Sequence, residues 1–192
     1  MNEVLGVSDS ALLKDLPESS LGNFVADAVL NKTNNHYSPS DKLPANICLL
    51  NNGGLRAQLP KGKITRGNIF ELMPFENGIV VITLSGAKTK LLFELLVEHN
   101  GAPFAGAVVT GKAKKMTSLK INGQDFDVSK NYKVVTSDYL AGGGDSYSFF
   151  KDPIKVDTLN YKLRDAIIDY LVDETKKGNT IKSRKDGRIK YE

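Results

Sequence analysis

Two glycine-containing segments combine a conformationally flexible backbone with side chains that can bind an anion or a polyol. The first is NNGGLR at residues 51–56. Its glycines allow positive φ and close approach of a ligand to the backbone. Asn51 supplies an amide, and Arg56 a planar guanidinium suited to phosphate or carboxylate. The segment is either an anion-binding turn or a tight turn with a solvent-exposed arginine.

The second segment, AGGGDSY at residues 141–147, places Asp145 among glycines. It is not a phosphate-binding P-loop, because no Gly-Lys-Ser/Thr follows it. A carboxylate accepts hydrogen bonds from neighbouring hydroxyls, so Asp145 suits a neutral polyol. The alternative is a flexible turn with no ligand.

Two aromatic residues stand beside such loops. Tyr139 precedes the second glycine segment, and Phe75 lies in PFENG, residues 74–78. Aromatic rings at loop positions can stack on a flat ligand ring. Each could equally be an aromatic residue at the edge of the core.

Residues for metal binding and nucleophilic catalysis are scarce. The chain has two histidines, His36 and His99, and no H-E-x-x-H or Cys/His cluster at ligand spacing. Cys48, the one cysteine, sits in an apolar run that disfavours a thiolate. We therefore expect no metal site, no catalytic residue and no cofactor in this chain, with His36 on the surface and Cys48 in the core.

The elements that must position these residues follow from periodicity and capping. ANICLL (45–50) reads as a strand buried on both faces, directly before NNGGLR. Ser20 is the expected N-cap of a helix that a polar loop ends at 31–44. Helices are also predicted at 66–73, 85–99 and from Asp157 or Thr158 to about 171, and strands at 78–84, 108–109, 118–121, 132–136 and 188–191. Helices and strands mix without strict βαβ alternation, which favours an α+β class.

Length and charge bound the remaining possibilities. The 192 residues suffice for one domain, and no apolar run approaches a membrane-spanning length. The formal charge is +4, but the basic C-terminal segment 176–192 holds seven basic and two acidic residues. Because the basicity belongs to this segment, we expect a solvated end and no nucleic-acid partner.

Several motifs together resemble the C-terminal domain of the 5′-nucleotidase and UDP-sugar hydrolase family. They cover nearly the whole chain in the family's order. The matching segments are LGNFVADAV (21–29), NNGGLR (51–56), ITRGNIFELMPFENGIVVITLSG (64–86), YKVVTSDYLAGGGDSY (132–147), LRDAIIDYL (163–171) and DGRI (186–189).

The resemblance implies a single four-layer α/β/β/α domain, residues 1–192, that binds the substrate's nucleoside. Phe75 and Tyr139 would sandwich the base, and Asp145 would hold the ribose hydroxyls. Asn77 would face the base edge. Asn51 and Arg56 would point toward the phosphate and the family's catalytic domain.

In that family, a preceding metallophosphatase domain carries two divalent metals, and these 192 residues do not include it. The resemblance therefore implies a separate metallophosphatase chain or missing domain as partner, and a periplasmic or secreted location. Met1 to Val4 shows no signal peptide, which leaves a cytoplasmic protein or a removed leader open. Two departures stand out: Tyr139 replaces the usual phenylalanine, and residues 11–18 carry only Lys14 where bacterial members place arginines.

Three functions remain in view. The chain is the substrate-binding part of a nucleotide-hydrolysing enzyme, a free-standing nucleoside- or nucleotide-binding module, or a structural domain without a ligand. These residues do not distinguish between bases or between a UDP-sugar and a 5′-nucleotide, and they do not indicate an oligomeric state.

Overall fold

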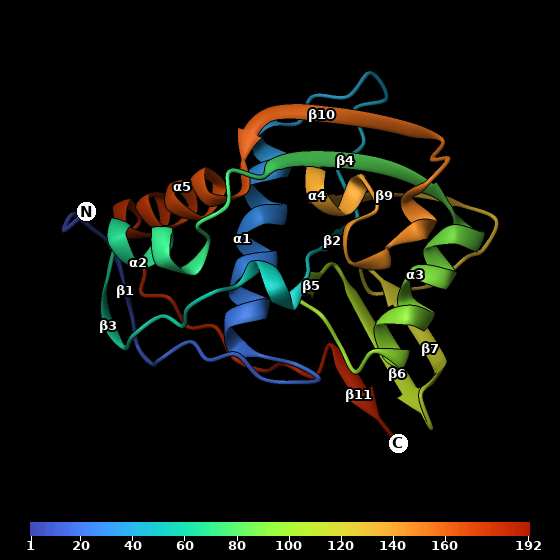
Figure 1. Ribbon diagram of the computed structural model, residues 1–192, viewed down its shortest axis with the longest axis horizontal. Helices are drawn as coiled ribbons and strands as arrows, with labels where there is room; N and C mark the ends of the chain where they lie inside the picture. The colour runs from blue at the N-terminus through green and yellow to red at the C-terminus, as the bar shows by residue number, and fades with distance from the viewer.

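A five-stranded mixed sheet runs through the middle of the molecule (Figure 1). The computed structural model describes residues 1–145 and 147–192. The sheet has the order β10-β4-β9-β2-β5. Its strands are β10 (Lys155–Lys162), β4 (Gly78–Ser85), β9 (Asn131–Ser137), β2 (Ile47–Leu49) and β5 (Phe104–Ala105). Only β2 and β9 pair in parallel; the other neighbours are antiparallel.

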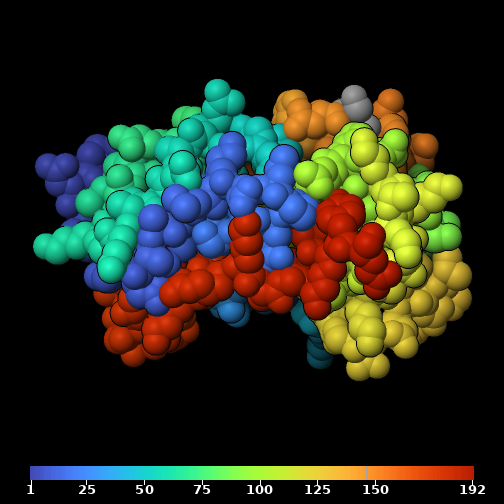
Figure 2. Space-filling model, turned by 90° about the horizontal axis from the view of Figure 1, so that it is seen from below, coloured from blue at the N-terminus to red at the C-terminus, as the bar shows by residue number. Residues whose placement is uncertain are grey.

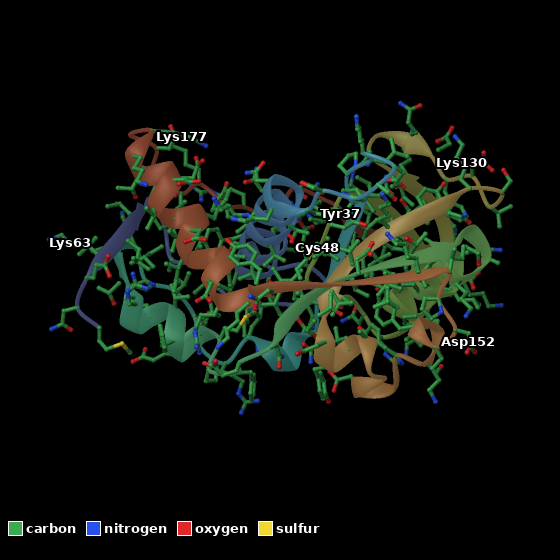
Figure 3. All side chains as sticks on the ribbon, turned by 90° about the horizontal axis from the view of Figure 1, so that it is seen from above. Tyr37, Cys48, Lys63, Lys130, Asp152 and Lys177 are labelled. Carbon is green, nitrogen blue, oxygen red and sulfur yellow. The ribbon has the colours of Figure 1, made fainter. Side chains whose placement is uncertain are left out.

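Helices α1 (Ser20–His36) and α5 (Leu163–Lys176) pack against each other and cover one face of this sheet. Cys48, Val81 and Val135 point to this side. A two-stranded sheet of β1 (Val4–Ser8) and β3 (Gly62–Thr65) and helix α2 (Arg66–Leu72) complete this half. Figure 1 shows them on the left, and the side chain labelled Cys48 lies inside the molecule in Figure 3.

The opposite face of the sheet packs on helix α3 (Gly86–Glu98) and a second, four-stranded sheet. Val80, Ile82 and Val134 point to this side, because neighbouring strand residues alternate between faces. Helix α3 contacts strands of both sheets. The second sheet has the order β11 (Ile189–Tyr191), β6 (Ala107–Lys112), β7 (Lys115–Ile121) and β8 (Gln124–Asp125). Three sheets, with helices packed on both faces of the largest one, confirm the expected α+β fold class.

The predicted helices at 66–73 and 85–99 are confirmed as α2 and α3. The Thr65 side chain caps α2 by accepting from the Asn68 amide, and the Asn68 side chain in turn accepts a hydrogen bond from the Thr65 backbone amide. Ser85 caps α3, and Asn122 and Gly123 both have positive φ in the turn between β7 and β8. Cys48 is fully buried, and burial raises the pKa of its thiol.

Helix α1 differs from the prediction at both ends. Ser19, not Ser20, is the N-cap, with its hydroxyl accepting from the Gly22 amide at 2.8 Å. The helix continues through the polar residues to His36, where the sequence predicts a loop. Packing overrides weak helix propensity here, because the buried Lys32 pairs with Asp173 of α5 at 2.6 Å. His36 is exposed, as expected.

The predicted start of the last long helix is wrong. Residues 155–162 form β10, which pairs antiparallel with β4, and α5 begins only at Leu163. Leu159 fits both a helical and an alternating pattern, and the half-buried residues of β10 recur every second position. Pairing with β4 selects the strand. The residues Ala166, Ile167 and Leu171 are buried on α5, within the range where a helix is predicted.

The last residues, 177–192, which we call the C-terminal strap, are not the solvated end expected from their charge. The strap crosses the N-terminal residues, as the red segment over the blue one in Figure 2 shows. Three of its cations pair with carboxylates elsewhere in the chain: Arg184 with Asp9, Lys185 with Asp15, and Arg188 with Asp27. Much of the C-terminal positive charge is thus neutralised locally. Short helices η1 (Asn52–Gly54), α4 (Asp138–Ala141), η2 (Gly144–Ser146) and η3 (Ser148–Phe150) complete the fold.

Candidate functional site

One edge of the five-stranded sheet gathers the three loops that the sequence analysis singled out. Strands β2 and β9 are parallel, so their carboxyl ends share an edge. Strand β4 is antiparallel to β9, and Ile79 at its start pairs with Ser137 at the end of β9. The loops after β2 and β9 and the loop before β4 therefore meet.

These loops line a cavity of about 320 Å³. All six predicted site residues are among those that line it: Asn51, Arg56, Phe75, Asn77, Tyr139 and Asp145, together with Gly53 and Gly54. The residues Phe75 and Tyr139 are 45% and 48% exposed, and both line the cavity, where they can present apolar surface to a ligand. The structure thus brings together residues that lie up to 94 positions apart.

The Asp145 carboxylate is hydrogen-bonded through both of its oxygens. Tyr139 Oη donates to Asp145 Oδ1 at 2.8 Å, and Asn51 Nδ2 donates to Asp145 Oδ2 at 2.5 Å. The bond to Asp145 raises the pKa of the Tyr139 hydroxyl above its usual value. Tyr139 therefore stays protonated and remains a donor at neutral pH.

The turn that carries Asp145 needs left-handed backbone. Gly143 has φ of +94° and Asp145 of +51°, a region that glycine adopts freely and aspartate tolerates. A Cβ on Gly144 would lie 2.5 Å from two ring atoms of Tyr139. Only glycine therefore lets the tyrosine ring rest on this turn.

The loop that carries Phe75 is fastened at several points. Arg164, buried at the start of α5, donates to the Met73 and Pro74 carbonyls at 3.4 Å and pairs with Glu76. Its guanidinium also lies 4.0 Å from the centroid of the Phe70 ring. Hydrogen bonds from Lys162 and Arg164 hold the pKa of Glu76 below its usual range. These contacts hold the loop that carries the Phe75 ring in place.

The same loop is joined to α4 and α5 through backbone groups. The Gly78 amide donates to Asp138 Oδ2 at 3.0 Å, and the Leu163 amide donates to the Asn77 carbonyl at 3.0 Å. Asp138 follows Ser137, whose hydroxyl caps α4 by accepting from the Leu140 amide at 3.1 Å. The two aromatic loops are therefore tied to each other directly.

Arg56 has the looser surroundings that an anion-binding side chain needs. Its amide donates to the Leu72 carbonyl at 2.8 Å, which fixes the backbone; among the described residues its guanidinium donates, from Nη1, only to the Gly53 carbonyl at 3.5 Å. Lys14 donates from Nζ to the Asn52 and Leu55 carbonyls at 3.1 and 2.8 Å. Lys14 therefore braces the turn beside Arg56.

Sequence reasoning missed the supporting residues Asp138, Glu76 and Arg164. Asp138 had a signal, because the Ser-Asp pair after a strand is typical of a helix N-terminus. Arg164 and Glu76 had none, since their pairing joins positions 88 residues apart.

No group of three or more His, Cys, Asp or Glu side chains that could hold a metal occurs within residues 1–145 and 147–192. The side chains that line the cavity offer stacking surfaces, one carboxylate, two amides and one guanidinium. This set can bind a flat ring, a polyol and an anion together. A larger hollow of about 510 Å³ lies between α1, α5 and the C-terminal strap, and its lining includes none of the predicted residues.

Comparison with known proteins agrees with this fold. Residues 4–152 match the family described as 5′-nucleotidase, C-terminal domain. The trifunctional nucleotide phosphoesterase protein YfkN of Bacillus subtilis is 32% identical over 98% of this chain, and an apyrase of Tabanus yao is 27% identical over 98%. The structure of a 5′-nucleotidase precursor from Thermus thermophilus covers the whole chain with a TM-score of 0.83 at 25% identity.

The chain spans only part of each relative: 14% of the Bacillus protein, 38% of the apyrase and 40% of the Thermus structure. A structure of an NAD nucleotidase from Haemophilus influenzae shares the fold over 99% of this chain, with a TM-score of 0.73. Within the described residues, none of the helices has both the length and the apolar character to cross a membrane. The ordered motifs, the profile match over most of the chain and the full-length structural match together show that this chain belongs to the 5′-nucleotidase C-terminal domain family.

Proposed function

We propose that this chain binds a nucleoside or nucleotide in the cavity at the sheet edge, as the substrate-binding domain of a 5′-nucleotidase-type phosphohydrolase. The observation that supports this most is the convergence of Phe75, Tyr139 and Asp145 on one cavity. A base stacked on such rings gains about 1–3 kcal/mol. A ribose beside it offers hydroxyl donors to a carboxylate, which is an acceptor only.

The polar residues at the rim complete the proposed binding mode. Asn77 would face the edge of the base, and Arg56 would hold the 5′-phosphate through its guanidinium fork. Asn51 would orient Asp145, to which it already donates. The phosphate would then lie at the open side of the cavity, where another domain or chain can reach it.

The residues of this chain do not fit the two divalent metals of such a hydrolase, because the described residues form no suitable ligand group. We therefore derive no hydrolytic step from this chain. The metals would be held by a metallophosphatase domain or partner chain, and the assembly would act in the periplasm or outside the cell.

Calorimetric titration with adenosine and AMP tests the binding. The wild-type chain should bind both, and Phe75→Ala should weaken both by roughly tenfold, as expected when one stacking ring is lost. Tyr191→Ala, which removes another exposed aromatic away from the cavity, is the control and should leave binding unchanged. If the wild type binds neither ligand, the proposal is wrong.

A second candidate is a free-standing binding module, favoured by the lack of metal-binding groups in the described residues. Mixing the chain with a separately produced metallophosphatase chain, AMP and Mn²⁺ separates the two. Phosphate release that rises when this chain is added, and falls again with Phe75→Ala, supports the enzyme component. Binding without any effect on phosphate release supports the module.

A further inference from the structure

The hydroxyl of Tyr139 is placed where a phenylalanine would offer the same ring and nothing more. The ring rests on the backbone of Gly144, since a Cβ there would lie 2.5 Å from it. The hydroxyl reaches Asp145 Oδ1 at 2.8 Å. Ring and carboxylate therefore form one packed unit, and the position of one depends on the other.

A count of acceptor sites shows what this unit leaves for a ligand. A carboxylate has about four lone-pair sites, two on each oxygen. Tyr139 occupies one site on Oδ1, and Asn51 occupies one site on Oδ2. Counting donors from the described residues, one site then remains on each oxygen, which matches the two donors of a vicinal diol.

Both bonds also orient the carboxylate. Asp145 is exposed, and without partners its terminal torsion would be free to rotate, because such sp³–sp² torsions are broad. Two donors on opposite oxygens fix the carboxylate plane before the ligand arrives. A ligand that meets a fixed carboxylate loses less conformational freedom on binding.

We propose that the Tyr139 hydroxyl is a specificity-determining group that holds Asp145 in the orientation required by a vicinal ribose diol. This inference rests on the proposed nucleoside binding and adds a role that the ring of Tyr139 does not have. The hydroxyl does not contact the base; it acts through Asp145 as a positioning group.

The test separates the hydroxyl from the ring by using Tyr139→Phe and two ligands. Adenosine carries the diol, and 2′,3′-dideoxyadenosine has the same base without it. Tyr139→Phe should weaken adenosine by about two- to tenfold, which corresponds to the net loss of one hydrogen bond, and leave the dideoxy ligand unchanged. The ratio of the two dissociation constants is the readout, because a general loss of folding or stacking would change both ligands alike.

Tyr161→Phe is a matched control. Tyr161 Oη donates to Asp169 Oδ2 at 2.7 Å, a bond of the same kind outside the cavity. Its removal should leave the ratio at the wild-type value. Asp145→Asn should bring the ratio close to one, with Tyr139 still present.

Three results decide the matter. A lower preference for the diol in Tyr139→Phe supports the inference. An unchanged or higher preference overturns it, the higher value meaning that Tyr139 competes with the diol. If wild type binds adenosine and only the ratio fails to respond, this inference alone is wrong; if wild type binds no adenosine, the proposed function itself fails.

Discussion

Asn51 and Asp145 are joined by a hydrogen bond of 2.5 Å across 94 residues of chain. One follows β2 and the other follows β9, and the parallel pairing of these strands brings the two turns together. The bond links the arginine-bearing turn to the glycine-rich turn. Each turn therefore depends on the other for its place in the cavity.

Removing this bond should weaken nucleoside binding. Asn51→Ala leaves Asp145 Oδ2 without its donor, so adenosine affinity should fall by about two- to tenfold, as for one lost hydrogen bond. Asn52→Ala is the neighbouring control, because Asn52 Nδ2 donates instead to the Gly101 carbonyl at 3.1 Å. Titration calorimetry compares the two variants. Equal affinities in both would show that the bond has no part in binding.

Arg56 should distinguish nucleotide from nucleoside. Arg56→Ala removes the guanidinium beside the cavity, so AMP affinity should drop about fivefold or more while adenosine affinity stays the same. The AMP preference of the wild type should also shrink at high salt, since exposed charges are screened. Arg66→Ala serves as control, because Arg66 pairs with Glu3 away from the cavity. Unchanged AMP binding in Arg56→Ala would remove Arg56 from the phosphate site.

Arg164 should act on binding through the Phe75 loop. Arg164→Lys keeps the charge but loses the planar fork that reaches two carbonyls and Glu76 together. Adenosine affinity should fall severalfold, and the free energy of unfolding by about 1–3 kcal/mol, because buried charged hydrogen bonds are lost. Urea unfolding and titration measure the two effects. Lys162→Met, which loses only the exposed contact to Glu76, should change both much less.

The C-terminal strap should make stability fall in acid. Hydrogen bonds from Arg184 and Lys185 lower the pKa values of Asp9 and Asp15 in the folded protein. Carboxylates of lowered pKa stabilise the fold fully above their unfolded pKa of about 3.9, and this stabilisation is lost as the pH falls through the folded values.

Urea unfolding between pH 7 and pH 2 measures this dependence. The variant carrying Asp9→Asn and Asp15→Asn should lose less stability on acidification than the wild type does. Identical pH profiles would mean that the strap contacts contribute nothing to the fold in solution.

The sequence alone predicted many of the local features of this protein. Capping residues and periodicity predicted α2, α3, β4 and β9, because these signals act within a few residues. The mixture of helices and strands predicted the α+β class, and the ordered motifs named Phe75, Tyr139 and Asp145 together. The ligand-binding role that these three residues share could be predicted before their positions in space were known.

Only the tertiary structure decided how distant residues pair. Leu159 belongs to a strand because β4 is beside it, and α1 reaches His36 because Lys32 meets Asp173. The strap is bound because its cations face Asp9, Asp15 and Asp27. The bond from Asn51 to Asp145 exists because the parallel pairing of β2 and β9 brings the loops after these strands together. Such contacts join positions far apart in the chain, and no local sequence pattern predicts them.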